Sequence, residues 1–132
     1  VGAGGTITGA GRFLKEKNSA VYIAAVEPAD SPVLSGGKAG PHGLMGIGAN
    51  FIPKNMDVSL IDEIICVREE DAYAAGRDMV ACEGVLVGIT AGAALWAATQ
   101  LALRPENAGK TIVALLPDGG ERYLSTPMYQ GE

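Results

Sequence analysis

The sequence predicts an α/β fold in which a parallel or mostly parallel sheet carries helices on both faces. Two observations support this prediction. Short runs rich in β-branched residues alternate with helical segments along the chain, which is typical of crossover connections between parallel strands. The last run, "KTIVALLP" at residues 110–117, is apolar throughout, as in strands that other elements cover on both faces.

The first half of the chain is expected to hold one helix and one strand. Residues 7–17 favour a helix, because small or apolar residues recur at helical spacing while the charged "KEK" lies on the other side. The inward positions would be Ile7, Ala10 or Gly11, and Leu14. "VYIAAVE" at residues 21–27 is rich in β-branched and aromatic residues and is closed by Pro28, so it is expected as a buried strand.

A loop rich in glycine and proline follows at residues 30–55. Ser31 could cap one short helical turn there, since Pro32 comes next. A loop this long inside a compact domain is usually functional.

The second half continues the alternation. "DEIICV" at residues 62–67 is expected as a strand, and residues 68–84 as a helix with acidic residues in its first turn and a glycine at its end. "VLV" at residues 85–87 is expected as a short strand, and residues 91–103 as an apolar helix that ends in a turn.

Composition excludes several classes of function. The 132 residues fit one domain, and a net charge of −5 without a lysine or arginine cluster argues against nucleic-acid binding. One histidine and two separated cysteines predict no metal site. Cys66 and Cys82 lie in apolar or helical patterns and are expected to be buried, reduced thiols. Residues 84–103 carry no charge, but their many glycines and alanines favour a strand, a turn and a buried helix over a membrane span.

The opening stretch "VGAGGTITG" predicts an anion site. Unpaired N–H groups at a helix N-terminus bind anions, and glycines let a phosphate approach the backbone. The dinucleotide fingerprint would need glycine at Ile7, and a P-loop would need lysine and a hydroxyl residue after Gly9. The loop therefore indicates a phosphate without a nucleotide, or else a tight strand-to-helix turn that binds nothing.

Thr90 begins a second helix in "GITAGAAL" and is interpreted as its N-cap. A buried hydroxyl must find a hydrogen-bond partner. Capping alone would satisfy Thr90, so a ligand-binding role stays open at this point.

Five stretches together resemble one family. These are "VGAGGTITGAGRFLKE", "AVEPADSPVL", "GPHGLMGIGANFIP", "GVLVGITAGAA" and "RPENAGKTIVALLPDGGERYLSTPMY". In this order they are similar to the C-terminal part of the cysteine synthases, or O-acetylserine sulfhydrylases, of the pyridoxal-phosphate (PLP) β-family with fold type II. The resemblance covers almost the whole chain.

The resemblance implies positions for both ends of the cofactor. The PLP phosphate would lie in the loop formed by Gly2, Ala3, Gly4, Gly5 and Thr6. Ala3 replaces the usual threonine, which removes one hydroxyl donor and keeps the backbone N–H groups. Thr90 would contact the pyridine nitrogen in place of the usual serine. A neutral hydroxyl does not stabilise a protonated ring by charge, which suits β-elimination.

The resemblance also places a substrate loop at Met45, Gly46 and Gly48. Met45 replaces the usual glutamine and Asn50 a usual glycine, so the substrate preference of this loop stays open. His42 is expected to be structural, because no partner for a catalytic base is near in the sequence. Asp118 and Glu121 are expected as loop caps or surface groups rather than catalysts.

The family's Schiff-base lysine and its loop for the substrate carboxylate lie upstream of the glycine loop. None of the five lysines of this sequence, Lys15, Lys17, Lys38, Lys54 and Lys110, lies in a matching segment. Residues 1–132 are therefore expected to be the C-terminal PLP-binding portion of a larger two-domain enzyme, with no catalytic residue and no activity of their own.

The activity implied by the resemblance is formation of L-cysteine from O-acetylserine and sulfide, a transferase reaction of cysteine biosynthesis. The resemblance implies a cytoplasmic homodimer without membrane contact, and it implies serine acetyltransferase as a protein partner. The alternatives are a relative similar to cystathionine β-synthase, a relative that uses O-phosphoserine, and a non-catalytic module.

Overall fold

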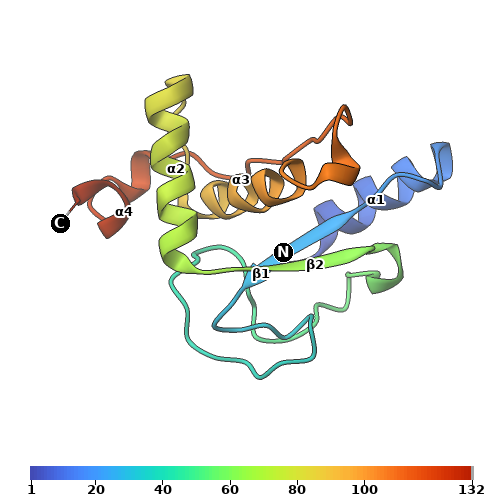
Figure 1. Cartoon of the computed structure of the whole chain (residues 1–132). Helices are drawn as coiled ribbons and strands as arrows, with labels where there is room; N and C mark the ends of the chain where they lie inside the picture. The colour runs from blue at the N-terminus through green and yellow to red at the C-terminus, as the bar shows by residue number, and fades with distance from the viewer. Residues whose placement is uncertain (132) are drawn as a thin grey trace. The chain divides into compact units, whose positions relative to one another are not determined.

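The computed structural model describes residues 1–131, which form two compact units. One unit holds Val1–His42 and Gly46–Cys66, and the other holds Gly43–Met45 and the chain from Val67 onward. The elements in chain order are helix α1 (Gly5–Lys17), strand β1 (Ala24–Pro28), the short 3-10 helix η1 (Val58–Leu60), strand β2 (Glu63–Val67), helices α2 (Glu69–Glu83) and α3 (Ile89–Ala102), the 3-10 helices η2 (Pro105–Asn107) and η3 (Glu121–Tyr123), and helix α4 (Pro127–Gln130) (Figure 1).

Strands β1 and β2 form a two-stranded sheet and run side by side in Figure 1. The carbonyl of Ile23, just before β1, accepts the N–H groups of Asp62 and Glu63 at the start of β2, at 2.9 and 3.3 Å. Because the beginnings of both strands meet, the strands are parallel. The mixed α/β class with a parallel sheet is confirmed.

Helix α1 begins two residues earlier than expected and ends as expected. Gly11 lies inward, since a Cβ atom there would come within 2.9 Å of Ile23 Cδ1. Leu14, expected inward, is 45% exposed, whereas Thr8 is buried and its hydroxyl accepts the Asp57 N–H at 3.0 Å. The predicted face of the helix is wrong at Leu14, because a close approach through Gly11 and a hydrogen bond to Thr8 hold this helix.

Helices α2 and α3 cross and form the main packing of their unit (Figure 1). A Cβ atom on Gly92 would lie 2.1 Å from the Ala72 carbonyl oxygen, so glycine lets the two backbones approach. The sequence predicts α2 well, with Glu69, Glu70 and Asp71 in its first turn and Gly84 at φ 68° after its end. None of the helices among residues 1–131 is long and apolar enough to cross a membrane.

Two predicted strands are wrong in the described chain. From residues 85–87 only Val87 pairs, in one antiparallel bridge to Gly119. Residues 110–117 form no strand, and Val113 is 88% exposed. Apolar β-branched residues favour an extended backbone, but a strand forms only where a neighbour supplies the hydrogen bonds. None of the described residues forms a strand ladder with residues 110–117.

The cysteines are free, as predicted, but both are exposed rather than buried. Cys66 takes the outward position between Ile65 and Val67, which are buried, because successive side chains of a strand alternate. Cys82 lies on an exposed side of the last turn of α2.

Candidate cofactor-binding site

The glycine loop before α1 contains glycines that the fold itself requires. A Cβ atom on Gly2 would lie 2.8 Å from the Gly46 carbonyl oxygen. Gly4 has φ 82°, and a Cβ atom there would lie 2.7 Å from Met56 Cβ. Backbone conformation and packing therefore account for these two glycines without any ligand.

Gly5 is different, because nothing in the structure demands a glycine there. A Cβ atom on Gly5 would meet no atom within 4 Å, its φ is not positive, and the residue is exposed. No side chain caps α1, and the first backbone bond of the helix runs from the Thr8 N–H to the Gly4 carbonyl at 3.1 Å. Thr6, in the first turn of α1, is exposed beside this uncapped helix end. An anion such as a phosphate fits this end of the helix.

The N-cap prediction for Thr90 is wrong. Helix α3 begins at Ile89, so Thr90 lies inside its first turn. The Asp118 carboxylate caps the helix instead, accepting the Ala91 N–H at 2.8 Å and the Thr90 N–H at 3.3 Å. Asp118, expected as a loop cap or surface group, instead caps helix α3 from a distant segment, so the Thr90 side chain is not needed for the cap.

The Thr90 hydroxyl donates to the Met45 carbonyl at 2.5 Å, and the residue is only 8% exposed. A hydroxyl has one proton to donate, so its remaining capacity is that of an acceptor. Leu44, 1% exposed, also lies within this unit. Thr90 therefore ties Gly43–Met45, the start of the predicted substrate loop, to the first turn of α3. Because 45 residues separate the partners, no local sequence pattern signals this bond.

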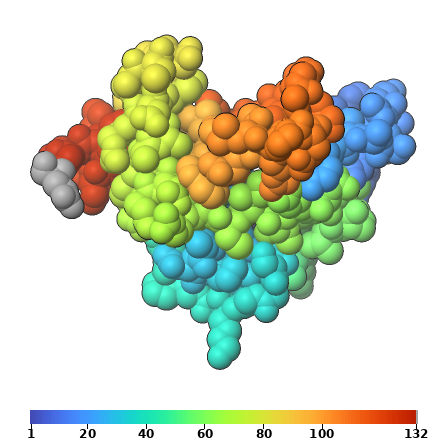
Figure 2. Space-filling model, viewed as in Figure 1, coloured from blue at the N-terminus to red at the C-terminus, as the bar shows by residue number. Residues whose placement is uncertain are grey.

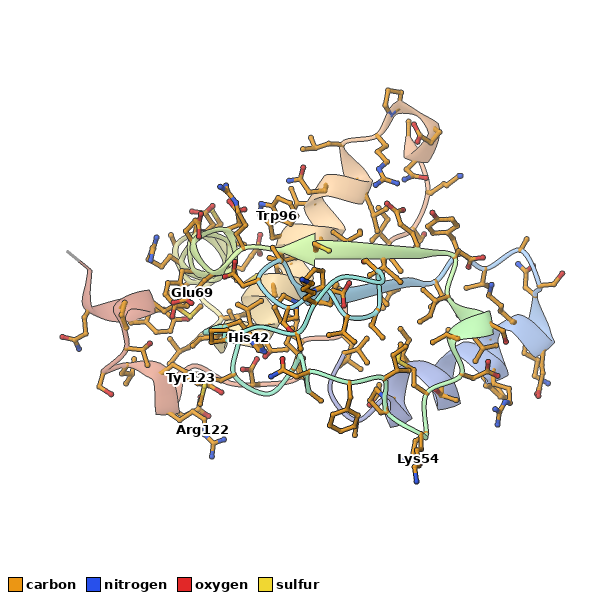
Figure 3. The ribbon with its side chains drawn as sticks, turned by 90° about the horizontal axis from the view of Figure 1, so that it is seen from below. His42, Lys54, Glu69, Trp96, Arg122 and Tyr123 are labelled. Atoms are coloured by element: carbon orange, nitrogen blue, oxygen red, sulfur yellow. The ribbon has the colours of Figure 1, made fainter. Side chains whose placement is uncertain are left out.

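The predicted substrate loop continues with tight turns. Gly46 has φ 95° and Gly48 has φ 66°. The Gly48 N–H donates to the Val1 carbonyl at 3.1 Å, and its carbonyl lies 2.8 Å from His42 Nε2. His42, labelled in Figure 3, thus holds the backbone of the loop, which agrees with its predicted structural role. Met45 is 59% exposed.

Sequence reasoning missed Glu27, which is 2% exposed at the end of β1. Its carboxylate accepts the N–H groups of Leu34 and Ser35 at 2.7 and 3.0 Å and the Ser35 hydroxyl at 2.5 Å. A glutamate closing a buried strand is an unusual position for a charge and could have indicated this role. The Cys66 sulfur lies 3.7 Å from a carboxylate oxygen of Glu27, and partial desolvation of this exposed residue's thiol raises its pKa above the ordinary value of 9.0.

No lysine among the described residues is buried. Lys15 pairs with Asp62 at 2.8 Å, and the other four lysines are exposed. Figure 3 shows Lys54 pointing away from the ribbon.

A hollow of about 330 Å³ lies between α2 and α3, and Figure 2 shows it between the yellow and orange segments. Its walls include Met79, Leu95 and Trp96, with Asp78 and Glu83 among its charged residues. Figure 3 shows Trp96 on α3. The hollow contains none of the predicted site residues.

Comparison with known proteins defines the class. The sequence profile of the family described as "Pyridoxal-phosphate dependent enzyme" matches residues 1–118. The chain belongs to this family of enzymes, whose cofactor is PLP.

Individual relatives narrow the class further. A cysteine synthase of Staphylococcus aureus (strain Mu50) is 49% identical over 129 residues, which are 98% of this chain and 41% of the relative. The crystal structure of a cysteine synthase from Entamoeba histolytica is 46% identical with a TM-score of 0.97, over 100% of this chain and 39% of that one. An O-acetylserine dependent cystathionine beta-synthase from Helicobacter pylori is 39% identical with a TM-score of 0.86, over 98% of this chain and 42% of that one. The chain thus spans about two-fifths of the relatives that it matches.

Proposed function

We propose that residues 1–132 are the C-terminal, PLP-binding portion of a two-domain cysteine synthase, which forms L-cysteine and acetate from O-acetylserine and sulfide. The observation that carries the proposal is the open position at Gly5, beside an uncapped helix end, in a chain that matches cysteine synthases along nearly its whole length. The Schiff-base lysine would come from the part of the enzyme outside this sequence.

The phosphate of PLP would be bound by the loop from Gly2 to Thr6. The N–H groups in the first turn of α1 point their positive ends toward the anion, and the helix dipole adds to the attraction. Thr6 would donate its hydroxyl, while Ala3, exposed here, adds no donor. The loss of that donor would weaken phosphate binding without abolishing it, because the backbone N–H groups remain.

The pyridine nitrogen of PLP would meet the Thr90 hydroxyl. When bound, PLP supplies the electron sink for breaking and making the bond at the substrate β-carbon. Thr90 is neutral and adds no charge that would keep the ring protonated. Because its single proton goes to the Met45 carbonyl, donation to an unprotonated nitrogen requires Thr90 to exchange that carbonyl for the ring.

Met45, Gly46 and Gly48 would face the amino-acid substrate. The positive φ values at Gly46 and Gly48 give this segment turns that other residues adopt only with strain. Met45 lacks the amide of the usual glutamine, so the substrate loses a polar contact there. We extend the proposal to a cytoplasmic homodimer that binds serine acetyltransferase, on the family resemblance alone.

Two glycines of α1 provide a matched test in the full-length protein. Gly5 and Gly9 are both exposed, and a Cβ atom on either would meet no atom within 4 Å. Alanine at either position should stabilise the helix by about 0.5–1 kcal/mol. Only Gly5→Ala should weaken PLP binding, by roughly tenfold or about 1.4 kcal/mol, because its methyl group meets the phosphate. PLP affinity is measured by titration of the apoprotein and stability by urea unfolding.

The comparison separates the competing interpretations. Equal PLP affinity for the two variants would contradict the phosphate assignment. A full-length protein that binds no PLP would favour the non-catalytic module. Among the enzymes, assays with O-acetylserine and sulfide, O-phosphoserine and sulfide, or serine and homocysteine identify the substrates. The higher identity to cysteine synthases favours the first pair.

A further inference from the structure

Asn50 has an unusual backbone conformation. Within residues 1–131 it is the one residue other than glycine with a positive φ, at 66°. Asparagine tolerates this region better than most residues, but glycine adopts it more easily. Because glycine would adopt this φ at less cost, the asparagine side chain needs a separate physical reason.

The side chain of Asn50 makes a hydrogen bond that glycine could not make. Its Oδ1 accepts the Ser31 hydroxyl at 2.6 Å, and Ser31 is only 1% exposed. The same hydroxyl oxygen accepts the Gly40 N–H at 3.3 Å. The buried hydroxyl therefore has partners for both donation and acceptance, and it joins the segment after β1 to the predicted substrate loop.

The rest of the segment offers little else to hold it at this end. At its other end, Gly48 is held through its N–H and its carbonyl by Val1 and His42. Phe51 and Ile52, which follow Asn50, are 63% and 51% exposed and bury little apolar surface. The hydrogen bond from Ser31 to Asn50 is thus a side-chain contact that holds the end of the loop near Phe51, where apolar packing is weak.

We propose that Asn50 is a positioning residue for the substrate, because its bond to Ser31 pre-orders the segment from Gly46 to Phe51. A segment that is already ordered loses less conformational entropy when a ligand binds beside it. The proposal rests on the proposed function of this segment as the substrate loop.

Asn50→Gly in the full-length holoenzyme tests the proposal, because glycine keeps the φ of 66° without strain while the side chain is lost. Loss of one hydrogen bond should speed hydrogen exchange of residues 46–51 roughly tenfold in the substrate-free enzyme. The KM for O-acetylserine should rise roughly fivefold with little change in PLP affinity. Asn50→Asp, which keeps an acceptor oxygen, should restore both values, whereas Asn55→Gly, at an exposed turn, should change neither.

Ser31→Ala should reproduce the effect of Asn50→Gly, and the double variant should add little to either. Unchanged hydrogen exchange in Asn50→Gly would overturn the link itself. Faster exchange with an unchanged KM would overturn its role in positioning the substrate. A wild-type enzyme that turns over no O-acetylserine would instead contradict the proposed function, and hydrogen exchange would still report on the bond to Ser31.

Discussion

Asp118 offers the sharpest test of how the structure positions Thr90, the residue proposed to meet the PLP ring. Its two carboxylate oxygens accept the N–H groups of Thr90 and Ala91, and its carbonyl accepts the Gly88 N–H at 2.9 Å. The side chain also fits closely against Gly88, where a Cβ atom would lie 2.2 Å from Oδ2. Removing this carboxylate should destabilise α3 where Thr90 is held.

The size of the effect follows from two contributions. Loss of an N-cap costs about 1–2 kcal/mol in proteins. Loss of a negative charge at a helix N-terminus costs about 0.5 kcal/mol more. Asp118→Ala should therefore lower the free energy of unfolding by about 2 kcal/mol, and Asp118→Asn, which keeps one acceptor oxygen, by about 1 kcal/mol.

Urea unfolding of the full-length protein measures these differences. Glu121→Ala is the matched control, because Glu121 is an exposed acid of the same segment, and it should change stability by less than about 0.5 kcal/mol. In Asp118→Ala, PLP affinity should fall as well, since Thr90 loses the backbone bond that fixes its position. Asp118→Ala as stable as Glu121→Ala would refute this account of the helix cap.

Three further predictions concern other contacts. Gly4→Ala should lower the free energy of unfolding by about 2 kcal/mol or more, because alanine would have to adopt a φ of 82° and would clash with Met56. If urea unfolding gave Gly4→Ala the same stability as Gly5→Ala, this prediction would be wrong. Thr90→Val should cost about 1–3 kcal/mol by leaving the Met45 carbonyl without its donor, whereas Thr90→Ser keeps the hydroxyl, and equal melting temperatures of the two variants would argue against the bond. Hydrogen bonds from Lys15 and the Ile23 N–H lower the pKa of Asp62 below its ordinary value of 3.8. The contribution of Asp62 to the free energy of unfolding is therefore complete above pH 3.8, and it is lost as the pH falls through the lower pKa of the folded state. Asp62→Asn should flatten this acidic part of the stability curve, and identical slopes for variant and wild type would count against the prediction.

The Gly4 prediction also shows why glycines of one motif are not equivalent probes. Valine or alanine at Gly4 would disturb Met56 and the turn before α1, so lost PLP binding there would not report on the phosphate alone. At Gly5 the space is open, and a methyl group perturbs a ligand without perturbing the fold. In the sequence the two glycines look equivalent, and only the folded structure shows that Gly4 is packed against Met56 while Gly5 is open.

The same distinction applies to the ring end of the site. The sequence identified Thr90 by motif but assigned it the cap of α3, because a threonine before an apolar helix usually takes that place. Asp118, 28 residues away in the sequence, caps the helix instead, and the Met45 carbonyl accepts the hydrogen bond of the Thr90 hydroxyl. Long-range partners of this kind leave no local pattern. Whether one PLP joins the glycine loop to Thr90 stays a prediction that the Gly5 and Thr90 variants test together.

By itself, the amino-acid sequence determined the parallel α/β class, the bounds of α2 from its acidic start and terminal glycine, and the family, because these depend on local propensity and on the order of motifs. Tertiary structure decided that residues 110–117 do not pair, which glycines packing demands, and which side chains hold Thr90 and Asn50. The physical reason is that strand pairing, close backbone approach and buried hydrogen bonds each require a second segment. Its identity is fixed only when the chain folds.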